Sequence, residues 1–268
     1  MKYKCLILDH DDTVAKSTPD IHYPSFIEAL KVLRPNYSNI SLEEFILKCF
    51  NPGFSELCKN ILHFNDKEQE YQYNIWTNYT KTNIPEFYAG FKELINDFKK
   101  NGGIVCVSSH SESHRIKRDY IVNCGIEPDK IFVWDIDEDK RKPSPYSIEE
   151  TIRLFKLKQE DILVVDDLKP GLDMANAGGV DFASAGWSHL IPEIINYMKD
   201  NSKYYLRDVK ELRNLIFEKD NWYDNYPFLF IKLLKYGEYL IFLKMIIKFI
   251  DMIKIISNAE KNNPINKN

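Results

Sequence analysis

The chain has 268 residues, of which 44% are hydrophobic and 28% are charged, so its composition is that of a globular protein with a sizeable core. Its formal net charge of -4 provides no basic field for a nucleic acid, and we expect no nucleic-acid partner. Five cysteines are scattered without CxxC spacing, and no signal-peptide pattern opens the sequence, so we expect a reduced, cytoplasmic protein.

The first predicted element is a buried strand within residues 3–15, which read YKCLILDHDDTVA. A short apolar run of this kind is typical of a strand that helices cover on both faces. The run ends in Asp9, Asp11 and Asp12, and carboxylates so close together repel one another unless a cation compensates them. The pattern predicts a ligand site at this strand end, with a hard divalent metal ion as the favoured cation.

Residues 17–83 are predicted to be helical throughout. The apolar spacing becomes that of helices in HYPSFIEALKVL, SLEEFILKCF, FSELCKNIL and KEQEYQYNIWTNYTK, and Ser41 and Glu44 form a predicted capping box. Packing inside this bundle is favoured for its aromatic residues, and lining a substrate pocket is the alternative. His22 could approach a substrate, but a structural role is favoured. A further helix is predicted over residues 84–98.

A second buried strand, IVCV at residues 104–107, follows a helix that ends at Gly102. Ser108 and Ser109 come next, and another helix begins near Glu112. A serine hydroxyl and the first N–H groups of a helix can both donate hydrogen bonds to an anion. The alternative is that the two serines only cap the helix.

A third buried strand, KIFVW, is predicted at residues 130–134. The loop after it carries Lys142, followed by Pro143 and Pro145, which hold the loop extended and start the next helix. Two adjacent basic residues precede Lys142, so its selection as the fixed cation depends on the proline spacing.

A fourth buried strand is predicted at residues 162–165 and ends in the pair Asp166 and Asp167. A helix follows and ends near Gly178, and a last helix, KELRNLIF, is predicted after Val209. Acids in the first turn of a helix also occur without any ligand.

Strands that alternate with helices predict an α/β fold: a Rossmann-like parallel sheet with helices on both faces, an inserted helical cap and an extra C-terminal helical segment. Residues 1–16 and 84–217 are the expected core, and residues 17–83 are the expected cap. Open parallel sheets bind ligands beyond the carboxyl ends of their strands. The polar residues at the four strand ends should therefore meet in one site.

The order of these strand ends resembles the motif order of the haloacid dehalogenase-like (HAD) hydrolase superfamily, in its helical-cap, phosphoglycolate phosphatase-like form. The resemblance covers about residues 1–217. The matching positions are Asp9, Asp11 and Thr13 for the first motif, Ser108 for the second, Lys142 for the third, and Asp166 with Asp167 for the fourth.

The resemblance implies a Mg²⁺-dependent phosphatase that hydrolyses a small phosphorylated metabolite through a phosphoaspartyl intermediate. The implied catalytic residues are the nucleophile Asp9, the general acid and base Asp11, and Lys142. The implied phosphate-binding residues are Ser108, Ser109, Lys142 and Thr13. The implied metal ligands are Asp9, Asp11 through its backbone carbonyl, Asp167, and Asp166 directly or through water.

Two alternative functions remain: a phosphomutase of the same superfamily, and a non-catalytic binding or regulatory protein with the same fold. Asp11 disfavours a dehalogenase, and the complete set of motifs disfavours a protein without activity. Asp12 is a departure from the family, in which many members carry Gly at this position.

Residues 218–268 are predicted to form an amphipathic helical tail. Lysines interrupt its apolar run every few residues, which leaves no uncharged stretch of the roughly 20 residues that a transmembrane helix needs. The tail could dock on the core, on a second subunit or on a membrane surface, and docking on protein is favoured.

Overall fold

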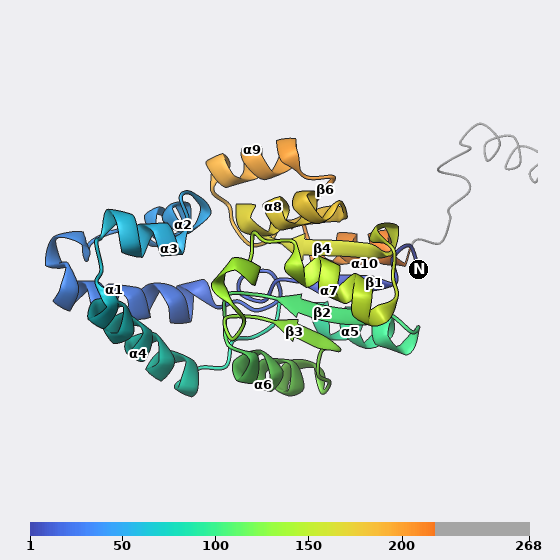
Figure 1. The fold of residues 1–268 in the computed structure, drawn as a ribbon, viewed down its shortest axis with the longest axis horizontal. Coiled ribbons are helices and arrows are strands. Elements are labelled where there is room, and N and C mark those ends of the chain that lie inside the picture. The colour runs from blue at the N-terminus through green and yellow to red at the C-terminus, as the bar shows by residue number, and fades with distance from the viewer. Residues whose placement is uncertain (218–268) are drawn as a thin grey trace, which may run out of the picture. The chain divides into compact units, whose positions relative to one another are not determined.

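A computed structural model describes residues 1–217, which form one compact unit. Six parallel strands make one sheet in the order β3-β2-β1-β4-β5-β6 (Figure 1). The strands are β1 (Cys5–Leu8), β2 (Ile104–Ser108), β3 (Lys130–Phe132), β4 (Ile162–Asp166), β5 (Asp181–Ala185) and β6 (Tyr204–Leu206). The predicted α/β fold with a parallel sheet is confirmed, but β5 and β6 were not predicted.

Helices bury both faces of the sheet. One face packs against α5 (Phe91–Lys100), α6 (Ser113–Cys124) and α10 (Val209–Ile216), and the other against α7 (Tyr146–Phe155), α8 (Lys169–Gly178) and α9 (Pro192–Asn201). Within β1, Leu6 and Leu8 face the first layer, whereas Cys5 and Ile7 face the second. All four side chains are fully buried. Burying an aliphatic side chain of this kind contributes about 1.5–3 kcal/mol, which explains the continuous apolar run.

Residues 18–82 contain helices only and have a core of their own, which includes Phe26, Leu30 and Phe45. Capping boxes at Ser41 and Asn65 start two of these helices, and the first of them was predicted. The elements are α1 (Tyr23–Leu33), α2 (Leu42–Phe50), α3 (Phe54–Glu56) and α4 (Asp66–Thr82), with π-helical turns at Thr18–His22 and Leu57–Ile61 and a 3₁₀ turn at Pro35–Tyr37.

The helix that was predicted over residues 84–98 begins only at Phe91, so that prediction is wrong at its start. Gly90 precedes the helix with φ 97°, a left-handed conformation that glycine adopts without strain. Phe87 instead pairs with Ala15 in an isolated β-bridge. The two chain segments that connect the helical insertion to the core therefore run side by side.

The predicted tail, residues 218–268, lies outside the described residues, and so do the predictions made for it. Within residues 1–217, no helix is both long enough and apolar enough to cross a membrane.

The chain topology places the carboxyl end of β1 at a switch point. From β1 the chain continues to β2 and β3 on one side, and it later adds β4, β5 and β6 on the other. β1 therefore lies between β2 and β4. Crevices at such switch points are where open α/β sheets bind ligands.

Candidate active site

Asp9 follows β1 directly, and both its backbone and its side chain are held. Its N–H donates to the Val165 carbonyl at 2.9 Å, which extends the pairing of β1 with β4. Its side chain is 7% exposed, and Lys142 Nζ lies 2.7 Å from Asp9 Oδ1. Within residues 1–217, no hydrogen-bond donor contacts Asp9 Oδ2. One oxygen of a buried carboxylate is therefore left available.

The structure places the Lys142 ammonium between two acids. Its Nζ lies 2.7 Å from Asp9 Oδ1 and 2.7 Å from Asp166 Oδ2. The neighbouring Lys140 and Arg141 make their contacts elsewhere. Burial alone would lower the pKa of Lys142, but Asp166 and Asp9 raise it above its ordinary value. Lys142 is therefore a fixed cation.

Asp9, Asp166 and Asp167 form a buried acidic cluster, in which one oxygen of each lies within 4.8 Å of the others. Burial raises the pKa of Asp9, and the two other acids raise it further, although Lys142 opposes them. Burial also raises the pKa of Asp167. One ammonium group does not compensate three buried carboxylates, and hard divalent cations prefer oxygen ligands. The residues therefore fit a divalent metal ion.

Both carboxylate oxygens of Asp167 have partners. The Thr13 hydroxyl donates to Oδ1 at 2.9 Å, and His189 Nε2 lies 2.6 Å from Oδ2. Thr13 is fully buried. The family resemblance implied that this threonine binds phosphate, which stays a prediction; in the structure its hydroxyl contacts Asp167. Thr13 and His189 together fix the orientation of Asp167.

Asp12 adopts a left-handed backbone conformation with φ 60°, which glycine would adopt without strain. For other residues this conformation costs about 1–2 kcal/mol, although Asp and Asn tolerate it better than most. Asp12 Oδ1 accepts the N–H groups of Ser17 at 3.1 Å and Thr18 at 3.0 Å. These hydrogen bonds offset the strain and hold the start of the helical insertion against the loop after β1.

Sequence analysis missed three consecutive residues after β5. Trp187 Nε1 donates to the Thr13 carbonyl at 3.0 Å, and the Ser188 hydroxyl donates to the Asp12 carbonyl at 2.5 Å. His189 contacts Asp167, as described above. No local pattern marks these residues, because their partners lie more than 20 positions away in the sequence. A prediction of β5 would have placed these residues at the carboxyl end of a strand, where ligand sites lie.

Ser108 ends β2 beside the end of β1, and Ser109 follows it directly. The Ser108 hydroxyl is buried and lies 3.6 Å from the sulfur of Met174. The Ser109 hydroxyl accepts the N–H of Ser111 at 3.1 Å, ahead of α6. The structure thus brings Ser108 to the same sheet edge as the acidic cluster, whereas the Ser109 hydroxyl serves the turn.

The Asp11 carboxylate lies outside the acidic cluster and contacts the helical insertion. His22 Nε2 lies 2.9 Å from Asp11 Oδ1, and Trp76 Nε1 donates to His22 Nδ1 at 2.9 Å. An indole N–H can only donate, so Nδ1 accepts and the ring proton is on Nε2, the nitrogen that lies near Asp11. Burial alone would raise the pKa of Asp11, but contact with His22 lowers it below its ordinary value.

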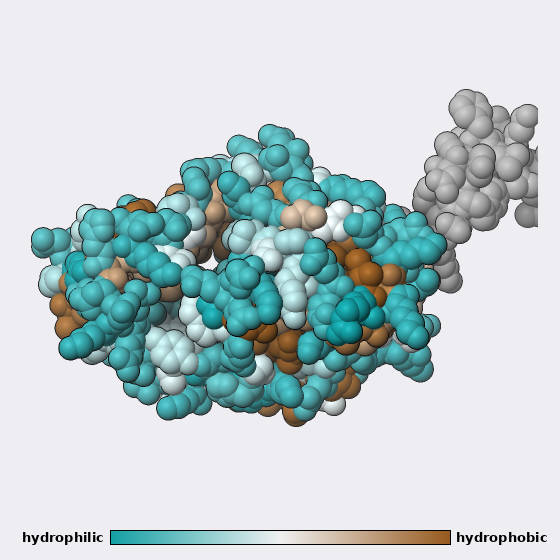
Figure 2. All heavy atoms as spheres, in the orientation of Figure 1, coloured by the Kyte–Doolittle hydropathy of each residue, from teal (hydrophilic) through white to brown (hydrophobic). Residues whose placement is uncertain are grey.

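The helical insertion also contacts the core around this site through side chains of several of its helices. Phe50 packs on Tyr197 with ring centroids 5.3 Å apart. Lys59 Nζ lies 3.1 Å from Glu138, and the Tyr73 hydroxyl contacts Glu112. Figure 2 shows a narrow hollow between the insertion and the sheet layer. The insertion is thus positioned over the carboxyl ends of the strands (Figure 1).

Comparison with protein families gave one match: the family described as haloacid dehalogenase-like hydrolase matches residues 6–185. A search of curated protein sequences gave no significant match.

Solved structures share the fold at low sequence identity. A protein from Haemophilus somnus, described as a predicted phosphoglycolate phosphatase, is 19% identical with a TM-score of 0.65, over 81% of this chain and 99% of that one. CbbY from Rhodobacter sphaeroides in complex with phosphate is 17% identical with a TM-score of 0.56, over 78% and 96%. A protein from Bacteroides vulgatus assigned as a beta-phosphoglucomutase is 16% identical with a TM-score of 0.60, over 80% and 87%.

Proposed function

The chain belongs to the haloacid dehalogenase-like hydrolase family, and we propose that it is a magnesium-dependent phosphatase acting on a small phosphorylated metabolite. The observation that carries this proposal is the contact of Lys142 with both Asp9 and Asp166, beside Asp167. Phosphoryl transfer to a carboxylate needs a nucleophile with a free oxygen and fixed positive charge around the phosphoryl group. Asp9 and Lys142 meet both requirements.

In the proposed first step, a carboxylate oxygen of Asp9 attacks phosphorus and the bond to the leaving oxygen breaks. Asp11 takes up a proton when the negative charge of the bound phosphoryl group raises its pKa, and it gives that proton to the leaving oxygen, so the alcohol leaves neutral. In the second step, Asp11 takes a proton from water, and the water oxygen attacks the phosphorus of phosphorylated Asp9. Inorganic phosphate leaves, and Asp9 is restored as a carboxylate.

His22 positions Asp11 for both steps in this proposal. Its Nε2 lies 2.9 Å from Asp11 Oδ1, and the hydrogen bond from Trp76 fixes the ring. Lys142 and the Ser108 hydroxyl bind phosphoryl oxygens. The Ser109 hydroxyl holds the turn ahead of α6 by accepting the N–H of Ser111, and Ser109 contributes to phosphate binding through this turn.

Asp9, Asp167 and the backbone carbonyl of Asp11 would hold magnesium, with Asp166 directly or through water. A bound divalent cation neutralises charge on the phosphoryl oxygens and on the acids around them. The protein's own contribution is to orient Asp167 through Thr13 and His189.

We assign residues 17–83 as a cap that excludes water while Asp9 is being phosphorylated. A phosphomutase would share this chemistry but transfer the phosphoryl group to a second alcohol. Phosphate release in the absence of any second alcohol separates hydrolysis from mutase activity.

We place the reaction in the cytoplasm, because all five cysteines are free thiols.

We expect removal of the metal ion to lower phosphatase activity by about 1000-fold or more, because the acids around Asp9 would then repel an incoming phosphate. Phosphate release from a panel of phosphomonoesters is measured with magnesium, with a chelator, and with excess magnesium restored. Calorimetry then compares magnesium binding by the parent protein and by Asp167→Asn. Chelator-resistant activity, or unchanged binding by Asp167→Asn, contradicts the metal assignment.

Gly171→Ala is expected to disturb the acidic cluster from within α8. A Cβ atom at Gly171 would lie 2.2 Å from Asp166 Cγ, so Asp166 must move and its contact with Lys142 breaks. Displacement of a catalytic group by about 1 Å can cost roughly 100-fold in rate, and we expect a loss of that order. The exposed Asn176 in the same helix supplies the control, Asn176→Ala. Equal kcat/KM in the two variants would show that the close approach at Gly171 has no role in activity.

A further inference from the structure

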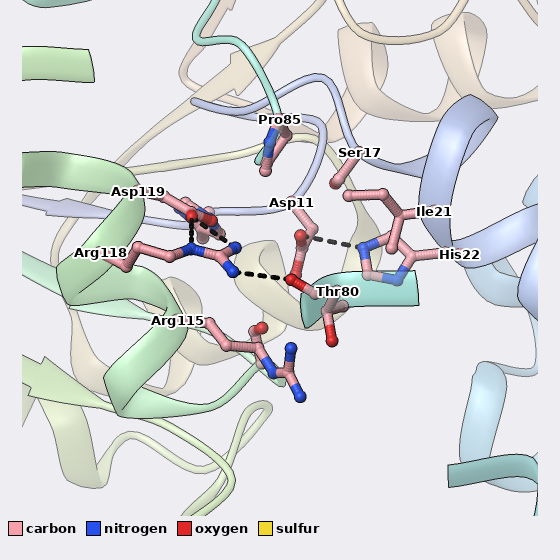
Figure 3. A pocket seen from close by; sticks show the side chains of 11 residues that line it. Asp11, Ser17, Ile21, His22, Thr80, Pro85, Arg115, Arg118 and Asp119 are labelled. Atoms are coloured by element: carbon pink, nitrogen blue, oxygen red, sulfur yellow. Dashed lines mark hydrogen bonds and ion pairs between the residues drawn. The ribbon is translucent and has the colours of Figure 1, made fainter. Parts of the chain in front are cut away.

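A pocket beside Asp11 lies between α6 of the core and the helices of the insertion (Figure 3). Asp11, His22, Thr80, Arg115 and Arg118 are among its lining residues. We call it the Arg115 pocket. Because Asp11 is the proposed proton donor to the leaving oxygen, the leaving alcohol of a substrate lies on this side of the phosphoryl group.

Arg115 is a buried guanidinium with unused donors. It is 2% exposed, and its Nε donates to Glu112 Oε2. Within residues 1–217, its two terminal nitrogen atoms make no hydrogen bond, and Figure 3 draws the guanidinium at the pocket without any bond to the labelled residues. Because both terminal nitrogen atoms lack a partner among these residues, they are free to donate hydrogen bonds to an acceptor that enters the pocket.

The side chain of Arg115 is fixed before any ligand arrives. Its guanidinium carbon lies 4.7 Å from the ring centroid of Trp76, which covers one face. Glu112 holds Nε from the other side and is itself held by the Tyr73 hydroxyl. Residues of both the core and the insertion thus position one guanidinium, and this preorganisation lowers the entropic cost of binding.

Arg118 differs from Arg115 because its donors are already used. It pairs with Asp119 at 2.7 Å, and its Nη1 donates to the Thr80 carbonyl at 2.7 Å. Arg118 therefore holds the end of α4 against α6 as a structural contact. Of the two arginines that line the pocket, Arg115 is the one that can bind a ligand.

We propose that Arg115 binds a second anionic group on the leaving alcohol of the substrate, a carboxylate or a second phosphate. This inference rests on the proposed phosphatase function. A guanidinium presents two parallel N–H groups that match the paired oxygens of both anions. The preferred substrate is then a small phosphomonoester that carries another oxyanion, and Arg115 selects it against neutral analogues.

The test uses pairs of substrates that differ in the second group alone. Glycerol 3-phosphate is compared with 3-phosphoglycerate, and propane-1,3-diol monophosphate is compared with its bisphosphate. For the parent enzyme we expect kcat/KM to favour at least one anionic member by about 10- to 100-fold, as a charge-assisted bidentate contact allows. A preference within the first pair identifies a carboxylate as the second group, and a preference within the second pair identifies a phosphate.

Arg115→Met should remove this preference mainly through KM, and Arg115→Lys should restore part of it. Lys117→Met makes the same change of charge at an exposed position of α6 and should leave the preference unchanged. Equal kcat/KM within both pairs for the active parent enzyme would overturn the Arg115 subsite and leave the phosphatase proposal intact. Failure to hydrolyse any phosphomonoester would contradict the phosphatase proposal itself.

Discussion

Asp9→Asn is expected to abolish phosphatase activity, with a loss of about 10⁴-fold or more in kcat, as for other nucleophiles whose removal ends covalent catalysis. An amide cannot accept the phosphoryl group, although it has nearly the shape of the carboxylate. The measurement is phosphate release under saturating substrate and magnesium. A variant with more than about a tenth of the parent rate would contradict nucleophilic attack by Asp9.

Stability measurements separate this loss from unfolding. Because burial raises the pKa of Asp9, the folded protein holds that proton more tightly than the unfolded chain does. Ionised Asp9 therefore lowers the stability of the metal-free protein once the pH exceeds the ordinary pKa of an aspartate. Asn removes this cost, so the unfolding temperature near neutral pH should be unchanged or higher. A marked fall would point to a structural role for Asp9.

Asp11→Asn is expected to lower hydrolysis of an alkyl phosphate by about 10²- to 10⁴-fold, the range typical of general acid and base catalysis. Asp11 lies outside the acidic cluster and contacts His22, so its loss should leave attack by Asp9 possible. A substrate with a good leaving group, such as p-nitrophenyl phosphate, needs no proton donor. With that substrate, the variant should still release nitrophenol in a first turnover and then stall as the phosphorylated enzyme.

Asp20→Asn is the matched control, because Asp20 is an exposed acid a few residues further along the chain. It should retain the parent rate with both substrates. The absence of a first-turnover burst in Asp11→Asn, together with a normal burst in the control, would place Asp11 in the attack step and refute its separate role.

The central strands were predictable because burial on both faces leaves a mark in the sequence. In β1 and β4, nearly every residue is fully buried, and each run ends abruptly in acids. β5 and β6 lack that mark: β5 is rich in small residues, and β6 has three residues with two partly exposed tyrosines. These two strands are stabilised by packing against α9 and by pairing with neighbouring strands. Both contacts involve residues distant in the sequence, so a local sequence pattern does not predict them.

The meeting of the acidic residues was predictable from topology, whereas their orientation was not. Because β1, β2 and β4 are parallel neighbours, Asp9, Ser108 and Asp166 lie at the same edge of the sheet however their side chains are oriented. The partners of each side chain depend on contacts across the fold, such as Thr13 with Asp167 and Trp76 with His22. The phosphate-binding role of Thr13 was implied by the motif and stays a prediction, whereas its contact with Asp167 could not be read from the motif.

Trapping of the phosphorylated enzyme tests the central claim most directly. The protein is mixed with magnesium and a ³²P-labelled substrate, quenched in acid within one turnover, and digested for mass spectrometry. We predict an acid-stable, hydroxylamine-labile label on the peptide that contains Asp9, reduced in Asp9→Asn to the background of unmixed protein. Label on any other residue, or rapid turnover in the parent enzyme without label at Asp9, would contradict the phosphoaspartyl mechanism.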